Sequence, residues 1–95
     1  MPLVSMKPML VEARRGGYAV GAFNTVDFGS CKAVVAAAAE LRAPVIVQLS
    51  VKTIAYWSHG TIAAWMRELG EAASVPVALH VDHCKDVKVI EGCIA

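Results

Sequence analysis

The stretch Val75-Pro-Val-Ala-Leu-His-Val-Asp-His-Cys84 begins with apolar residues and becomes polar toward its carboxyl end. Val77 to about Val81 predicts a β-strand, because a short apolar run bounded by a proline is typical of a strand that is covered on both faces. Side chains alternate between the two faces of a strand. We therefore expect Ala78, His80 and Asp82 to share one face, and the residues between them to share the other.

Two upstream stretches have the same character. Tyr18–Phe23 and Val45–Leu49 are also short apolar runs, and they predict a first and a second strand. Each run is followed by a polar residue on one face, Asn24 after the first and Ser50 after the second. The three predicted strands therefore each have one wholly apolar face and one face that becomes polar at the carboxyl end.

Amphipathic segments separate these strands and predict helices, with an irregular stretch at residues 51–60. The expected N-terminal caps are Ser5, Asp27, Thr61 and Asp86. The first helix is expected to run through Leu10 to Arg14 before Gly16–Gly17, and the second to reach about Leu41. The third is expected to include Ile62 and Leu69 on one face, and the fourth to extend to about Cys93.

Strand and helix thus alternate three times at about 30 residues per unit, which indicates a parallel sheet covered by helices. Both the (β/α)8 barrel and the open doubly wound sheet have this pattern. The turn Gly21-Ala-Phe-Asn24-Thr-Val-Asp27 lacks the glycine-rich phosphate sequence of dinucleotide-binding folds. We therefore predict a (β/α)8 TIM barrel, of which three units are present, with Asn24, Ser50 and Asp82 meeting at its carboxyl-end mouth.

The composition indicates part of a larger body. Apolar residues make up 57% of the 95 residues and charged residues 18%, which is more apolar surface than so small a chain can bury by itself. We expect residues 1–95 to be the N-terminal portion of one incomplete barrel domain. A net charge of +1 gives no reason to expect a nucleic-acid partner. No apolar run is long enough for a membrane span. Three cysteines without paired spacing suggest that the protein is located in the cytoplasm.

The residues His80-Val-Asp82-His83-Cys84 form the densest group of reactive side chains. In a regular strand Asp82 and His83 would point to opposite faces, so they can share a site only if the strand ends or bulges between them. His80 is expected to be a core histidine facing the barrel wall.

Other reactive side chains are weaker candidates. His59 lies in a predicted loop and is a weak candidate for a second metal ligand. Cys84 is a weak candidate for a nucleophile, and Lys52 and Lys85 are expected to be solvated surface residues. Trp57 and Trp65 are expected to be packing groups.

Residues 75–84 resemble the signature of the class II fructose-bisphosphate aldolases, and residues 17–24 and 43–50 resemble that family's first two strands. The resemblance implies a zinc-dependent barrel that cleaves fructose 1,6-bisphosphate reversibly to dihydroxyacetone phosphate and glyceraldehyde 3-phosphate. It implies Asp82 as the acid/base, His83 as a zinc ligand, Asn24 as a substrate contact and Ser50 as a phosphate contact. The remaining zinc ligands are expected beyond residue 95, so we expect these 95 residues to be inactive alone and the full-length protein to be a homo-oligomer.

Three alternatives remain open at this point. The substrate could be tagatose 1,6-bisphosphate, because the residues that read the configuration at C4 are expected to lie outside these 95 residues. The chain could belong to a non-catalytic barrel subunit that supports a partner aldolase, although such a subunit has no need of Asp82 and His83 together. An open doubly wound domain that binds a nucleotide is the third alternative.

Overall fold

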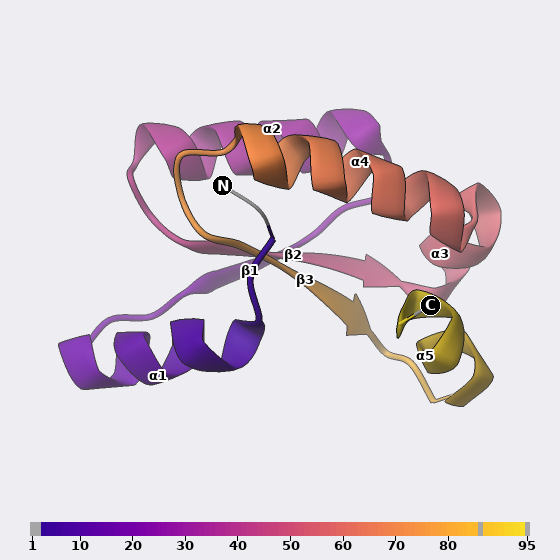
Figure 1. Cartoon of the computed structure of the whole chain (residues 1–95), viewed down its shortest axis with the longest axis horizontal. Helices are drawn as coiled ribbons and strands as arrows, with labels where there is room; N and C mark the ends of the chain where they lie inside the picture. Colours follow the sequence, from indigo (N-terminus) through magenta and orange to yellow (C-terminus); the bar gives the residue numbers. More distant parts are fainter. Residues whose placement is uncertain (1–2, 86, 95) are drawn as a thin grey trace.

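Three parallel strands form one sheet at the centre of the chain, as predicted (Figure 1). In the computed structural model, which describes residues 3–85 and 87–94, they are β1 (Gly21–Asn24), β2 (Val45–Ser50) and β3 (Val77–Asp82), in the order β1-β2-β3. Parallel neighbours need crossover connections. Here α2 (Phe28–Glu40) makes the first crossover, and α3 (Val51–Trp57) and α4 (His59–Ala72) make the second.

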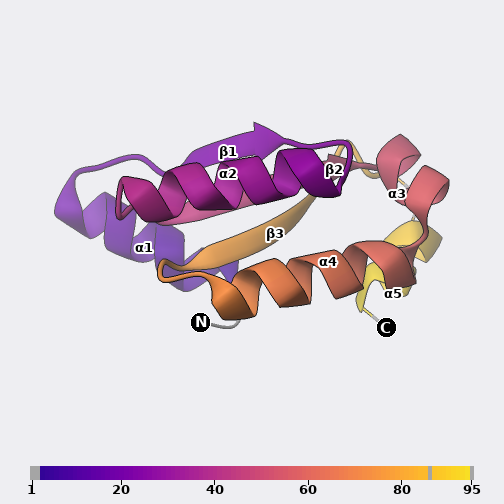
Figure 2. The same ribbon diagram turned by 90° about the horizontal axis from the view of Figure 1, so that it is seen from above.

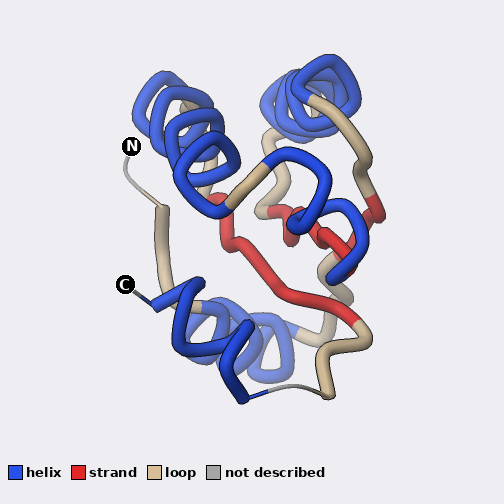
Figure 3. Tube along the Cα trace, turned by 90° about the vertical axis from the view of Figure 1, so that its right-hand side faces the viewer, coloured by secondary structure: helices blue, strands red, loops and turns tan. Residues whose placement is uncertain are grey.

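The main core lies between the sheet and helices α2 and α4 (Figure 3). Val45, Val47, Leu49 and Val77 point toward these helices and are at most 3% exposed. The helices contribute buried residues at helical spacing, namely Cys31, Val35, Ala38, Ile62, Met66 and Leu69. This division confirms the predicted strand phase, since the wholly apolar face of each of these two strands is the one that the helices cover.

Helix α1 (Met6–Gly16) covers the opposite face of the sheet at the amino ends of the strands (Figure 1). Met9 packs there against Ile46 and Ala78. The helix ends at Gly17, whose left-handed backbone (φ 73°) is a conformation that glycine adopts without a steric penalty. The carboxyl half of this face lies beyond the cluster of Met9, Ile46 and Ala78.

Each strand ends one residue later than predicted, and two larger differences concern the start of the first strand and residues 51–60. The first strand was expected from Tyr18, but it begins at Gly21 because Tyr18 N–H bonds the carbonyl of Ala13 and keeps this segment at the helix end. The stretch predicted to be irregular is largely helix α3. Its seven residues are too few to show a helical period, and the helix depends on the Ser50 cap and on burial of Ile54.

The caps were predicted with mixed success. Asp27 caps α2 as predicted, in a capping box with Ser30. The cap of α4 is Ser58, whose Oγ accepts a hydrogen bond from Thr61 N–H, so the prediction of Thr61 was wrong by three residues. Ser5 is the N-cap residue of α1 by position, without a side-chain cap bond. The predicted cap Asp86 lies outside the described residues.

Helix α5 (Val87–Ile94) lies near the carboxyl ends of the strands, beside the start of α4 (Figure 2). Leu79 of β3, on the face of the sheet that α2 and α4 cover, is 37% exposed. Within the described ranges, none of the helices has the length and apolar character needed to cross a membrane.

The buried position of Leu49 gives a direct test of this packing. Leu49→Ala is expected to lower the free energy of unfolding by about 2–5 kcal/mol, because it leaves a cavity between β2 and the helices. Leu41→Ala is the matched control, since Leu41 is 78% exposed, and it should change stability by less than about 0.5 kcal/mol. Urea unfolding of both variants measures the difference, and equal costs would contradict the assigned core.

Candidate active site at the carboxyl ends of the strands

Strand β3 ends at Asp82, directly before His83. The backbone of His83 is left-handed (φ 54°), so the chain turns and the alternation of a regular strand stops there. As a result His83 Nε2 lies 3.4 Å from Asp82 Oδ2. The structure therefore brings together the two side chains that a regular strand would have placed on opposite faces.

His80 also belongs to this group. Its Nε2 lies 3.8 Å from Asp82 Oδ1, and its side chain is 37% exposed, so it is not the satisfied core histidine that was expected. It lies two positions before Asp82 along the strand, which places both on one face. The Asp82 carboxylate consequently has an imidazole near each oxygen.

A row of polar side chains crosses the sheet at the level of His80. Asn24 pairs in register with Gln48, and Gln48 with His80. Gln48 Nε2 donates a hydrogen bond of 2.8 Å to Asn24 Oδ1, so the carbonyl of the Asn24 amide is engaged and its NH2 group remains as a donor. Sequence reasoning did not select Gln48, although its phase on β2, the same as that of Ser50, could have identified it.

Ser50 pairs in register with Asp82, one step closer to the carboxyl ends. Its Oγ accepts a bond from Thr53 N–H at 3.4 Å and lies 3.2 Å from Thr53 Oγ1. The residue is therefore the N-cap of α3. Because a hydroxyl has two lone pairs and one proton, capping leaves it capacity for a ligand, and its predicted phosphate contact stays a prediction.

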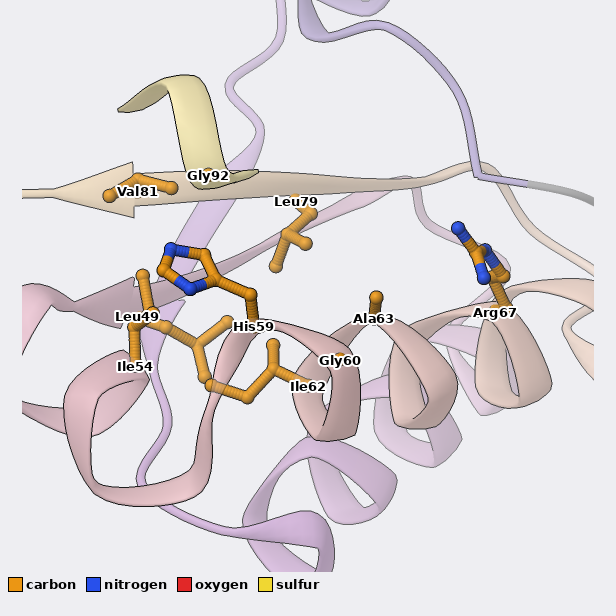
Figure 4. A pocket seen from close by; sticks show the side chains of 10 residues that line it. All are labelled: Leu49, Ile54, His59, Gly60, Ile62, Ala63, Arg67, Leu79, Val81 and Gly92. Carbon is orange, nitrogen blue, oxygen red and sulfur yellow. The ribbon is translucent and has the colours of Figure 1, made fainter. Parts of the chain in front are cut away.

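His59 is not in this group. It begins α4 and lines a cavity of about 340 Å³ with Arg67 and Gly92 (Figure 4). Its Nε2 is 3.4 Å from the Val89 carbonyl oxygen. The β3 residues of that cavity, Leu79 and Val81, point to the face opposite Asp82. His59 therefore has no place beside His83 as a metal ligand.

The turn after Asn24 is tightly bonded. Thr25 N–H and Oγ1 both donate to the Gln48 carbonyl, at 2.9 and 3.1 Å, and the Cys31 thiol donates to Thr25 Oγ1. Burial raises the pKa of Cys31, which keeps the thiol protonated as that donor. The Ser30 backbone N–H, 2.7 Å from Asp27 Oδ1, and the Ser30 hydroxyl lower the pKa of Asp27.

The family model for class II fructose-bisphosphate aldolases matches residues 4–95. The chain belongs to this family. It is 40% identical over 87 residues to the D-tagatose-1,6-bisphosphate aldolase subunit GatY of Klebsiella oxytoca, a match that covers 92% of this chain and 31% of that protein. The chain thus spans about a third of that relative's length.

Solved aldolase structures agree with this assignment. The YdjI aldolase of Escherichia coli K12 superposes with a TM-score of 0.84 at 26% identity, over 94% of this chain and 34% of that one. The fructose-bisphosphate aldolase of Campylobacter jejuni superposes with a TM-score of 0.81 at 29% identity, over 96% and 32%. These aldolases are TIM barrels, so the three β/α units are part of a barrel fold, as predicted.

The capping carboxylate of Asp27 predicts a pH dependence. Because its pKa is lowered in the fold, it stabilises the fold above its unfolded pKa, and this contribution is lost as the pH falls through the folded pKa. Asp27→Ala should therefore unfold at a lower temperature than the wild type at neutral pH, and the difference should shrink in acid. Asp27→Asn, which caps without titrating, is the control in thermal unfolding, and an Ala deficit that is constant with pH would contradict the prediction.

Proposed function

We propose that this chain supplies the acid/base and one metal ligand of a zinc-dependent aldolase that cleaves fructose 1,6-bisphosphate reversibly to dihydroxyacetone phosphate and glyceraldehyde 3-phosphate. The observation that carries the proposal is the end of β3 at Asp82, which leaves its carboxylate 3.4 Å from the His83 imidazole. Membership of the class II family supports the reaction class.

Asp82 is suited to move the proton of the cleavage step. When the C3–C4 bond breaks, its electron pair remains on C3 and the C4 hydroxyl becomes an aldehyde, so that hydroxyl must lose its proton. The Asp82 carboxylate would accept this proton and return it to the aldehyde oxygen in the aldol direction. The side chain is 23% exposed, which is open enough to be reached from the mouth.

His83 is suited to hold a divalent ion. Its side chain is 83% exposed at the strand end, and neutral imidazole is the commonest metal-ligating side chain. A catalytic zinc ion usually has three protein ligands, and the described residues contain no group of three candidate ligands, so others would come from outside them. When bound, the ion would supply Lewis-acid stabilisation of the negative charge on the ketone half.

Asn24 and Ser50 would bind the substrate. The amide NH2 of Asn24, oriented by the bond from Gln48, can donate to a hydroxyl or carbonyl oxygen of the sugar. The Ser50 hydroxyl can contact a phosphate oxygen. We propose the phosphorylated sugar as the ligand of this site. We also propose that residues 1–95 are the N-terminal portion of one cytoplasmic barrel, which is homo-oligomeric when complete. This barrel is expected to bind neither nucleic acid nor membrane.

Tagatose 1,6-bisphosphate is the second candidate substrate, because the GatY relative, 40% identical to this chain, is named for that sugar. The two sugars differ only in configuration at C4, the carbon whose hydroxyl Asp82 would deprotonate. Comparing kcat/KM for the two bisphosphates in the full-length protein decides between them, and we expect the fructose isomer to be preferred. A higher value for the tagatose isomer would reverse this assignment and keep the aldolase mechanism.

Asp82→Asn tests the catalytic role in the full-length protein. Removing a general acid/base should lower kcat by about 10²–10⁴-fold, while the far-UV circular dichroism spectrum stays that of the wild type. Unchanged turnover with retained folding would instead favour the non-catalytic supporting subunit.

His83→Ala tests the metal ligand. The expected result is loss of bound zinc, measured as metal per protein after dialysis, together with loss of turnover. His59→Ala is the matched histidine control and should keep its zinc, since His59 lies on the other side of the sheet. Equal zinc content in the two variants would remove His83 from the ligand set.

A further inference from the structure

Trp57, the last residue of α3, makes a hydrogen bond to the turn that follows β1. Its indole Nε1–H donates to the carbonyl oxygen of Val26 at 2.8 Å, across 31 positions of sequence. Helix α3 lies beyond the N-terminal end of α2, on the side where the strands end (Figure 2). The bond therefore links the segment after β2 to the segment after β1, at the rim of the candidate site.

The indole ring is held by other aromatic rings. The rings of Trp57 and Trp65 lie edge to face with centroids 4.9 Å apart, and Trp65 contacts Phe28 in the same way at 5.9 Å. Tyr56 lies against the opposite end of this group, 5.0 Å from Trp57. Such contacts favour a defined ring orientation, so the direction of the N–H group is determined by packing from α2 and α4.

The turn that accepts this bond carries a substrate-binding candidate. Asn24 is the last residue of β1, and Val26 follows two positions later. Val26 N–H donates to Ser30 Oγ, and Thr25 N–H donates to the Gln48 carbonyl. The turn is thus fastened to α2 through Ser30, to β2 through Gln48 and to α3 through Trp57.

These contacts form a closed ring through the candidate site. Ser50 caps α3, α3 ends at Trp57, Trp57 bonds the turn after Asn24, and Asn24 accepts a bond from Gln48, two residues before Ser50. Breaking the Trp57 bond would open this ring, because that bond joins the turn to α3.

We propose that Trp57 is a positioning residue, which fixes the separation of Asn24 and Ser50 through its hydrogen bond to Val26. The proposal rests on the proposed function in so far as Asn24 and Ser50 bind the sugar bisphosphate. The Trp57 N–H group is engaged by the Val26 carbonyl, so Trp57 is assigned no direct role toward the substrate. Its effect passes through the turn of residues 24–27.

Trp57→Phe separates the hydrogen bond from the packing, because phenylalanine keeps an aromatic ring and lacks the N–H donor. Trp65→Phe is the matched control, since it also exchanges an indole for a phenyl ring within the same aromatic group. Amide hydrogen exchange in the full-length protein should be about two- to tenfold faster at Val26 and Asp27 in Trp57→Phe than in Trp65→Phe, as expected for the loss of one hydrogen bond. Equal exchange in the two variants would overturn the proposal.

Kinetics test whether the effect passes through Asn24. Trp57→Phe should raise KM for fructose 1,6-bisphosphate about two- to tenfold with little change in kcat, because the loss falls on binding rather than on the chemical step. In an Asn24→Ala background the same substitution should have no further effect on KM. Fully additive losses would show that Trp57 acts independently of Asn24 and would overturn the proposal.

Different results would contradict the aldolase function and the positioning role of Trp57. If the full-length protein cleaves neither sugar bisphosphate, the proposed function is wrong, and the exchange comparison still decides whether Trp57 holds the turn. If turnover is normal and exchange is equal in the two variants, the positioning role is wrong and the aldolase assignment stands.

Discussion

The position of β2 between two parallel partners is the constraint on which the candidate site depends. Gln48 is in register with both Asn24 and His80, and Ser50 is in register with Asp82. Because all three strands run in the same direction, their carboxyl ends meet at one edge of the sheet. A shift of β2 by one residue would turn Gln48 and Ser50 toward the helices and place Val47 and Leu49 at the mouth.

The two faces of the sheet differ in polarity along the same strands. The face under α2 and α4 is apolar and carries the main core, although Phe23 and Leu79 on it are partly exposed. On the other face α1 covers the amino half through Met9, Ile46 and Ala78. The carboxyl half bears Gln48, Ser50, His80 and Asp82, which are partly exposed. This exposure, the contact of His80 with Asp82 and the bonds of Gln48 and Ser50 to neighbouring side chains reduce the free-energy cost of placing polar groups on a sheet.

Much of this arrangement could be predicted, because it depends on local patterns. The alternation of apolar residues indicated which face of each strand the helices cover, and Asn24, Ser50 and Asp82 were placed at one edge from strand phase alone. The misses came from features without a local period. Helix α3 is a short helix that depends on its Ser50 cap and on burial of Ile54. The first strand begins only at Gly21, the residue that pairs in register with Val45.

The sequence by itself determined the order of the strands and of the helices other than α3, the parallel sheet, the apolar and polar faces and the membership of the reactive cluster from His80 to Cys84. Each of these is a property of spacing along the chain. Only the tertiary structure decided that the side chains of Asp82 and His83 lie 3.4 Å apart, because that requires β3 to end between them with His83 in a left-handed conformation. It also decided that His59 faces another cavity, that Gln48 orients Asn24, and that Trp57 reaches the turn at Val26. The contacts of His59, Gln48 and Trp57 join residues that are far apart in sequence. Their geometry depends on how the helices pack on the sheet rather than on any pattern within a single segment.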